Sequence, residues 1–281
     1  MAALGFDMLP EGCVSTILSL TSPPEACRSS LVSSIFRSAA DSDVVWERFL
    51  PSDYRDIVSR SVTPLKFSSK QELFLSLCNP ILIDAGNKSF ALEKSSGKIS
   101  YILSARELSI TWSDEPSHWS WKYLPESRFP VVAVLRTISQ LEIQCKIKTE
   151  MLSPNTTYGA YLIMKISDDA YGLDSIPSEI SVEVGNHVSS STTYLYRRNS
   201  KKQQMECLFY TNRMQMLRSR VKEGNDQVPR EREDGWMEIE LGEFINGEVD
   251  EEVKMSLMEV KGHHLKGGLI IEGIEVRPKH R

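Results

Sequence analysis

The spacing of apolar residues changes near residue 80, and this change constrains the fold more than any other feature of the chain. Before it, apolar residues recur at helical spacing, as with Val14, Ile17 and Leu18, which is typical of an amphipathic helix. After it, residues 141–148 (LEIQCKIK) alternate between apolar and polar side chains, which is typical of a half-buried strand. The chain is therefore predicted to be of the α+β class, with a helical region before a β-rich region.

Helix boundary signals are frequent in the first eighty residues. Pro23-Pro24 can end one helix and begin the next, because proline is tolerated in a first helical turn. Ser69 and Glu72 have the spacing of a capping box ahead of an apolar stripe. The predicted helices lie within residues 9–20, 26–40, 41–50 and 68–80.

The strand candidates after residue 80 are short, and turn signals such as Asn246-Gly247 separate many of them. They are residues 141–148, 161–166, 180–184, 236–241, 253–258 and 269–276. No amphipathic helical pattern intervenes, so an antiparallel β-sandwich is predicted. Residues 197–234 are polar and rich in both charges, and we expect a long, mobile insertion between strands there.

Composition excludes several classes of function. The net charge of −5 argues against nucleic acid as the partner, because phosphate binding requires a basic surface. No apolar run approaches the roughly 20 residues of a membrane helix, and residues 1–12 lack the basic and apolar regions of a secretory signal. The five cysteines show no C-x-x-C spacing, so free thiols in a reducing compartment are expected. No catalytic motif, metal site or cofactor site is predicted.

The helical region is small for an independent domain, since a module of this length buries only about 60% of its unfolded surface. Its apolar residues are spread around more than one face. They either pack on the β-rich region or form a docking surface for another protein.

The ordered motifs of residues 9–51 (LPEGCVSTILSL to VVWERFLP) resemble an F-box of the plant type. The resemblance implies that residues 1–50 bind the Skp adaptor, and through it the cullin scaffold, of an SCF ubiquitin ligase, with residues 51–80 as a helical linker. The residues that would contact the adaptor are Leu9, Pro10, Ile17, Leu18 and Trp46.

Residues 104–136, 152–166 and 234–244 resemble the phloem-protein-two lectin domain, the family that includes Nictaba-like lectins. The resemblance implies that residues 81–281 form a jelly-roll-like β-sandwich that binds N-acetylglucosamine oligomers. Two positions depart from the family. Gln140 stands where members carry an aromatic residue, and Cys145 where they carry glycine. Either departure would weaken sugar binding if that position lines or supports the site.

Tryptophans in a polar stretch are the candidate sugar-binding residues, because sugars stack C–H faces on rings and direct hydroxyls to carboxylates. Trp119 and Trp121 are two residues apart, so both rings face the same way on an extended backbone. Trp119 is expected to be exposed, whereas Trp112 and Trp121 are each either a core residue or an exposed ring. The full candidate set is Trp112, Trp119, Trp121, Trp236, Glu240 and Glu243, of which Glu243 is implied by the resemblance alone.

The segment 236–241 (WMEIEL) supplies part of that set. Alternation places its apolar residues on one face and Trp236, Glu238 and Glu240 on the other. Trp236 is then either an outer-face ring beside carboxylates or a tryptophan that packs under the charged insertion.

The functional hypothesis is a non-catalytic adaptor that recruits a glycan or glycoprotein target to an SCF-type ligase. The resemblance and the free cysteines place it in the cytoplasm and nucleus, with no nucleic-acid or membrane partner. Residues 197–202 (RRNSKK) are either a nuclear signal or a solvated loop. Two alternatives remain: a lectin without a ligase role, and a protein recruiter whose sugar site has decayed.

Overall fold

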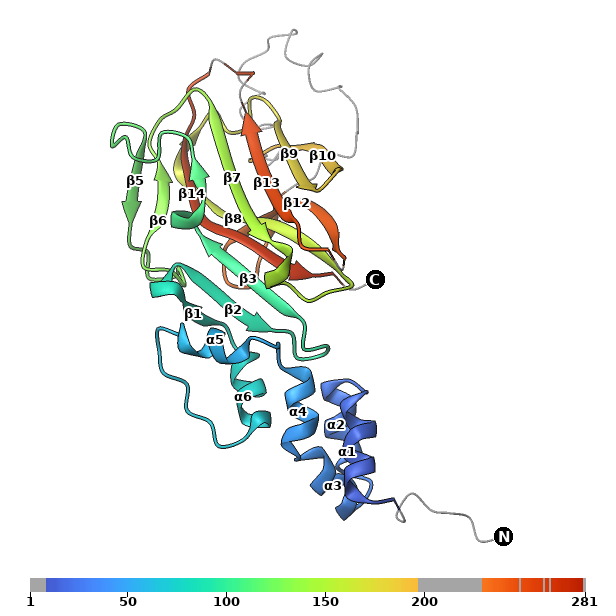
Figure 1. Cartoon of the computed structure of the whole chain (residues 1–281). Coiled ribbons are helices and arrows are strands. Elements are labelled where there is room, and N and C mark those ends of the chain that lie inside the picture. The colour runs from blue at the N-terminus through green and yellow to red at the C-terminus, as the bar shows by residue number, and fades with distance from the viewer. Residues whose placement is uncertain (1–8, 197–228, 248, 260, 263, 280–281) are drawn as a thin grey trace, which may run out of the picture.

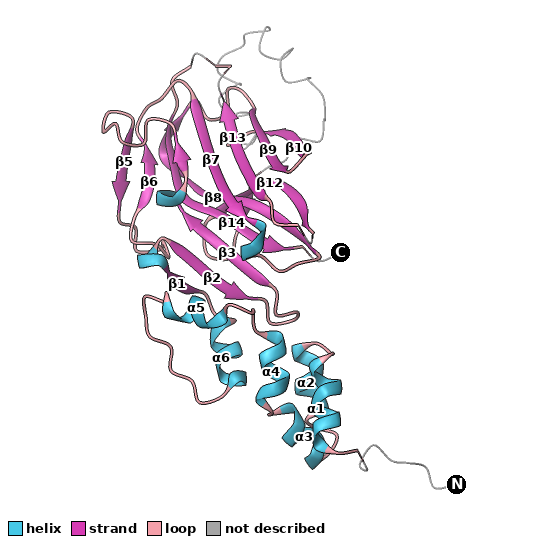
Figure 2. Ribbon diagram, in the orientation of Figure 1, coloured by secondary structure: helices cyan, strands magenta, loops and turns pink. Residues whose placement is uncertain are grey.

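The structure is a computed structural model, which describes residues 9–196, 229–247, 249–259, 261–262 and 264–279. Helices form one end of an elongated molecule and a β-sandwich forms the other (Figures 1 and 2). The predicted order, a helical region followed by two antiparallel β-sheets, is confirmed. No helix in the described part of the chain has the length and apolar character needed to cross a membrane.

Six short helices lie between residues 9 and 80, the described part of this region. They are α1 (Glu11–Ser19), α2 (Pro23–Ser29), α3 (Ser34–Ala40), α4 (Asp43–Phe49), α5 (Tyr54–Ser59) and α6 (Lys70–Leu77). The single helix predicted across residues 26–40 is wrong, because Ser33 caps a new helix by accepting a hydrogen bond from the Phe36 N–H. Ser69 caps α6 in the same way, as predicted, whereas the Glu72 carboxylate accepts hydrogen bonds from Ser68 and not from the Ser69 N–H of a full capping box.

The strands form two sheets, here called sheet A and sheet B. In the described residues, sheet A has the order β1-β2-β3-β14-β8-β12-β11, with β6 joining β14 and β5 joining β6. Its strands are β1 (Ile81–Ile83), β2 (Lys88–Leu92), β3 (Ile99–Ser104), β5 (Trp119–Lys122), β6 (Val132–Leu135), β8 (Thr156–Tyr171), β11 (Arg230–Glu231), β12 (Met237–Asn246) and β14 (Gly267–Pro278). Sheet B has the order β10-β9-β13-β7-β4, with β4 (Ser109–Ile110), β7 (Leu141–Lys148), β9 (Ser178–Val184), β10 (His187–Thr193) and β13 (Glu252–Glu259).

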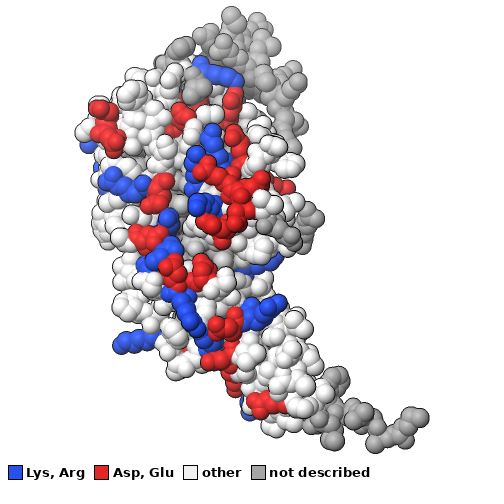
Figure 3. All heavy atoms as spheres, in the orientation of Figure 1, with Lys and Arg blue, Asp and Glu red and all other residues white. Residues whose placement is uncertain are grey.

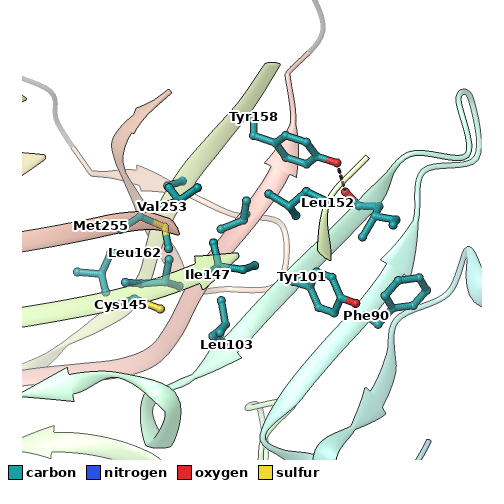
Figure 4. Packing of buried hydrophobic residues seen from close by; sticks show 14 of the residues in the cluster. Phe90, Tyr101, Leu103, Cys145, Ile147, Leu152, Tyr158, Leu162, Val253 and Met255 are labelled. Atoms are coloured by element: carbon teal, nitrogen blue, oxygen red, sulfur yellow. Dashed lines mark hydrogen bonds between the residues drawn. The ribbon is translucent and has the colours of Figure 1, made fainter. Parts of the chain in front are cut away.

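The main core lies between the two sheets. The apolar residues of β7 are all buried, so the predicted alternation is confirmed. In Figure 4, Cys145 and Ile147 of β7 gather with Met255 of β13 and Leu162 of β8. Burial raises the pKa of the Cys145 thiol to about 12, so this side chain is a protonated, apolar part of the core.

A second, smaller core covers the outer face of sheet A. It consists of Ile102, Phe129, Val132, Ile163 and Trp236. The segment 123–131 covers this face, and buried Glu272 holds the segment by accepting hydrogen bonds from the Ser127 hydroxyl and the Arg128 N–H. Sheet A is therefore buried on both faces where Trp236 lies.

The helices are fixed to the sandwich. One hydrophobic cluster runs from Val14 in α1 to Val276 in β14. Arg60, after α5, donates hydrogen bonds of 2.8 and 3.1 Å to both carboxylate oxygens of Asp84, and the Val62 N–H bonds the Leu82 carbonyl. Residues 51–80 are thus part of the folded body, while the predicted boundaries at residues 50 and 80 stay predictions.

The predicted insertion at residues 197–234 lies outside the described residues up to position 228, as does the candidate nuclear signal. The described remainder forms β11, which pairs with the start of β12.

Candidate functional site

The predicted adaptor-binding residues differ in exposure. Pro10 is exposed, Ile17 is 48% exposed and Leu9 is half-buried. Leu18 and Trp46 are buried, and the Trp46 indole donates a 2.7 Å hydrogen bond to the Ala40 carbonyl. Direct adaptor contact through Leu18 and Trp46 does not fit this burial. Both side chains instead hold the helices together beneath the surface.

Further apolar side chains on the helical region are exposed, and sequence reasoning did not assign them to the adaptor surface. They are Leu20, Leu31, Val32 and Val44. They lie at the end of α1, in the turn between α2 and α3, and in α4. The sequence feature that could have identified them is that they are apolar residues outside the helical stripes expected to be buried. With Ile17, the helical region thus exposes several large apolar side chains, which is suited to a protein partner.

The three tryptophans of residues 112–121 have different environments. Trp119 is only 2% exposed and its indole donates a 3.0 Å hydrogen bond to the Thr111 carbonyl. Trp121 is half-buried and its indole donates to the Ser113 carbonyl at 3.3 Å. The two rings thus face the same way, as predicted.

The exposure predicted for Trp119 is wrong. Trp119 pairs with Leu135 of β6 and lies in the main core, on the inner face of sheet A. The segment 111–113 folds over the two rings and accepts their N–H groups. The Arg106 guanidinium lies 3.6 Å from the Trp121 ring centroid. A Trp119–Trp121 platform open to solvent does not form.

Trp112 is the exposed indole of this stretch, with 58% of its surface accessible. Its φ of 61° is left-handed backbone, which is strained for an aromatic residue. This conformation directs its side chain outward. The Thr111 and Ser113 carbonyls on either side accept the hydrogen bonds of the Trp119 and Trp121 indoles. The Trp112 ring is tilted by 59° against His118, with 6.2 Å between centroids.

Contacts extend from Trp112 across the loops at this end of the sandwich. The His118 Nδ1 lies 2.9 Å from the Thr137 carbonyl. The Tyr171 hydroxyl donates a 3.2 Å hydrogen bond to the Arg136 carbonyl, and Tyr171 is 46% exposed. We call Trp112, His118, Arg136 and Tyr171 the loop-end surface. The pairing of β8 with β14 brings Tyr171 to this surface, and no local sequence signal singled it out.

Trp236 is on the outer face of sheet A, as the alternation predicted, but it is only 1% exposed. Its indole donates a 3.2 Å hydrogen bond to the Glu126 carbonyl, and the Lys165 amine lies 4.6 Å from its ring. Among the described residues, segment 123–131 and Lys165 of β8 lie against the ring. Trp236 therefore offers no open ring face for a sugar.

The predicted glutamates already form ion pairs within the protein. Lys279 lies 2.6 Å from a Glu240 oxygen and 3.0 Å from a Glu243 oxygen. Burial alone would raise the pKa of Glu238, but hydrogen bonds from Arg277 and Arg232 lower it. Charges of both signs are also interspersed on the face drawn in Figure 3. Such a surface is suited to ion pairing within the protein.

The predicted sugar-binding residues do not converge on one site. Trp119 and Trp121 are on β5, whereas Glu240 is on β12, with β6, β14 and β8 between them. Four inter-strand steps of about 4.8 Å separate the two strands by roughly 19 Å. Trp236 lies on the opposite face of sheet A from Trp119. Of the set, Trp112 alone is an exposed ring.

The two family departures lie in different places. Cys145 is in the core and cannot line a surface site, whereas Gln140 is exposed just before β7. Among the described side chains, no group of three His, Cys, Asp or Glu is placed to hold a metal ion.

Comparison with known proteins accounts for both parts of the chain. An F-box domain model matches residues 6–48 and a Phloem protein 2 model matches residues 98–278. F-box protein PP2-B15 of Arabidopsis thaliana is 56% identical over 279 residues, covering 97% of this chain and 96% of that protein. F-box protein VBF of the same plant is 53% identical over 279 residues, covering 97% and 99%. The chain belongs to the plant F-box proteins of the PP2-B family, in which an F-box precedes a Phloem protein 2 domain.

Proposed function

We propose that this protein is the substrate-recruiting subunit of an SCF-type ubiquitin ligase and that its β-sandwich binds glycans or glycoproteins that contain N-acetylglucosamine. The F-box docks on a Skp-type adaptor and, through it, on the cullin scaffold. The observation that carries this role is the apolar surface that the matched F-box residues leave exposed, including Ile17 and Leu31. F-box proteins are typically non-catalytic adaptors.

The chain performs no bond chemistry in this proposal. It holds a target near the ubiquitin-conjugating enzyme, and tethering raises the effective concentration of the reacting amine. The fixed packing of residues 51–80 on sheet A supports this role, because it restricts the positions that a bound target can take relative to the F-box.

Adaptor binding is expected to fall at least tenfold in Ile17→Asp, because the charge would have to be buried against an apolar partner surface. The melting temperature should stay near that of wild type, since Ile17 is half exposed. Affinity is measured by titrating a purified Skp-type adaptor. Val62→Asp, an exposed apolar position after α5, is the matched control and should bind like wild type. Unchanged binding in Ile17→Asp would contradict the assigned surface.

Support for glycan binding comes from the loop-end surface. Trp112 presents an open ring for C–H stacking, and His118 and Arg136 lie beside it with polar groups for hydroxyls. Tyr171 supplies a second exposed ring at the far side of the Arg136 backbone. A ligand with several sugar rings could contact both aromatic residues.

Trp112→Ala is expected to weaken chitotriose binding several-fold to about tenfold, since one stacked ring contributes on the order of 1 kcal/mol. The melting temperature should change little because the ring is exposed. Isothermal titration calorimetry measures the affinity, and Tyr123→Ala, another exposed ring of this region, is the control. Chitotriose binding equal to that of wild type would exclude Trp112 from a sugar site.

A protein recruiter without sugar binding is the second candidate function. Two observations favour it. Lys279 forms ion pairs with both Glu240 and Glu243, and Gln140 stands at a position where family members carry an aromatic residue. A glycan array separates the two candidates, because a pure protein recruiter would bind no glycan on it. Copurification of the adaptor separates both from a lectin without a ligase role. We further propose that the protein acts in the cytoplasm and nucleus, which imaging of a fluorescent fusion tests.

A further inference from the structure

We propose a peptide-binding site in the groove between the β9–β10 hairpin and the end of β12. Its occupant is an extended segment of the recruited protein in which an apolar side chain stands next to lysine or arginine. The groove is separate from the loop-end surface. The inference depends on the proposed recruiting role in one respect, namely that the peptide belongs to a recruited protein.

The groove has a volume of about 560 Å³ and is lined by apolar residues together with polar and acidic ones. Val182 and Val184 of β9 and Phe244 of β12 are buried and form its floor. Val188 of β10 and Ile245 of β12 line it as well, yet are 62% and 65% exposed. Single exposed apolar residues are ordinary, but two of them beside an apolar hollow are typical of a binding surface.

The charges around the groove select a basic partner. Glu243 and Glu251 line it, and no lysine or arginine is among the lining residues that the structure describes. The Glu243 carboxylate is shared with Lys279, whereas Glu251 has no ion pair within the described part of the chain. A lysine or arginine beside the inserted apolar side chain would complement Glu251.

A sugar is a poor occupant of this groove. Two ring side chains are among its described lining residues: the exposed imidazole of His187, and Phe244, which is 7% exposed and stacks on Tyr158. A ligand there meets aliphatic side chains, carboxylates and an imidazole, and no exposed tryptophan, tyrosine or phenylalanine ring among the described lining residues. This chemistry fits a peptide and distinguishes the groove from the surface around Trp112.

The edge of β12 favours an extended conformation of the peptide. β11 pairs with Met237 and Glu238, and no other described strand pairs with this edge from Ile239 to Asn246. An unpaired edge offers backbone hydrogen bonds to an added strand. Gly242 marks one end of the groove, because a Cβ there would lie 2.9 Å from a Val182 methyl carbon. The two sheets are therefore in close contact at that point.

The test uses the full-length protein and an array of synthetic nine-residue peptides. Each peptide carries a central leucine flanked by lysines, and matched versions replace the lysines by glutamate or the leucine by serine. Wild type should bind the lysine–leucine peptides at least fivefold more tightly than either matched version. Ile245→Ser should reduce this binding at least threefold, and Glu251→Lys should shift the preference toward the glutamate peptides. Val62→Ser is the control and should behave as wild type.

Three results would overturn the site: no preference among the peptides in wild type, no effect of either groove substitution, or competition by chitotriose for the peptide. Trp112→Ala should leave peptide binding unchanged. If a groove variant melts below wild type, Ile245→Thr or Glu251→Gln takes its place. Loss of adaptor binding with peptide binding retained would refute the ligase role and leave the groove intact.

Discussion

Trp119→Ala is expected to destabilise the β-sandwich by roughly 3–5 kcal/mol, the usual cost of truncating a core tryptophan. The Trp119 ring lies in the main core and its indole N–H satisfies the Thr111 carbonyl, so the variant loses both packing and a hydrogen bond. Urea unfolding followed by circular dichroism measures the change in the free energy of unfolding. Trp112→Ala is the matched control from the same stretch and should unfold within about 0.5 kcal/mol of wild type.

A different pattern would reverse the assignment of these rings. If Trp119→Ala unfolds like wild type but loses chitotriose binding, Trp119 is an exposed ligand contact. If Trp112→Ala is the strongly destabilised variant, Trp112 is the core residue. The paired measurement of stability and affinity therefore separates a core role from a binding role for each tryptophan.

A fragment of residues 81–281 is expected to be far less stable than one of residues 51–281. The shorter fragment lacks α6, which packs against β2 and buries Leu73 and Leu77 in the main core. Each buried side chain of this kind contributes about 1.5–3 kcal/mol. Since whole domains are stable by only about 5–15 kcal/mol, this loss would remove much of the stability of the sandwich.

Thermal melts of the two purified fragments, monitored by circular dichroism, test this expectation. Arg60→Met in the longer fragment reports separately on the ion pair with Asp84, and should lower its stability by less than the truncation does. Burial alone would raise the pKa of Asp84, but hydrogen bonds from Arg60 and Lys88 lower it. Equal melting of the two fragments would show that residues 51–80 are a plain linker, as the sequence had predicted.

Local patterns were sufficient where one physical requirement dominated. The alternation of residues 141–148 predicted the buried face of β7, because a strand with one solvated face must place alternate side chains in the core. The same rule placed Trp236 on the face opposite Ile239. The rule did not predict that Trp236 is buried, because segment 123–131 covers that outer face. Alternation contains no information about what lies above a sheet.

Glu240 and Glu243 illustrate a second limit. Their residue type and spacing fit hydrogen bonding to a sugar, and nothing nearby in the sequence suggests a competitor. Lys279 reaches both carboxylates because β12 and β14 pair with the same strand, β8. Charge pairing across a sheet depends on the strand order, which the sequence pattern did not predict.

The sequence by itself determined the class and order of the two regions, since the change of apolar period and the ordered F-box and lectin motifs are local properties. Tertiary structure alone decided which tryptophan meets solvent. Trp112 and Trp119 occupy the same polar stretch, so composition treats them alike. The left-handed backbone at Trp112 turns its ring outward, and the carbonyls on either side of it then close over Trp119 and Trp121. Burial depends on which distant segments cover a side chain, and that is a property of the folded chain.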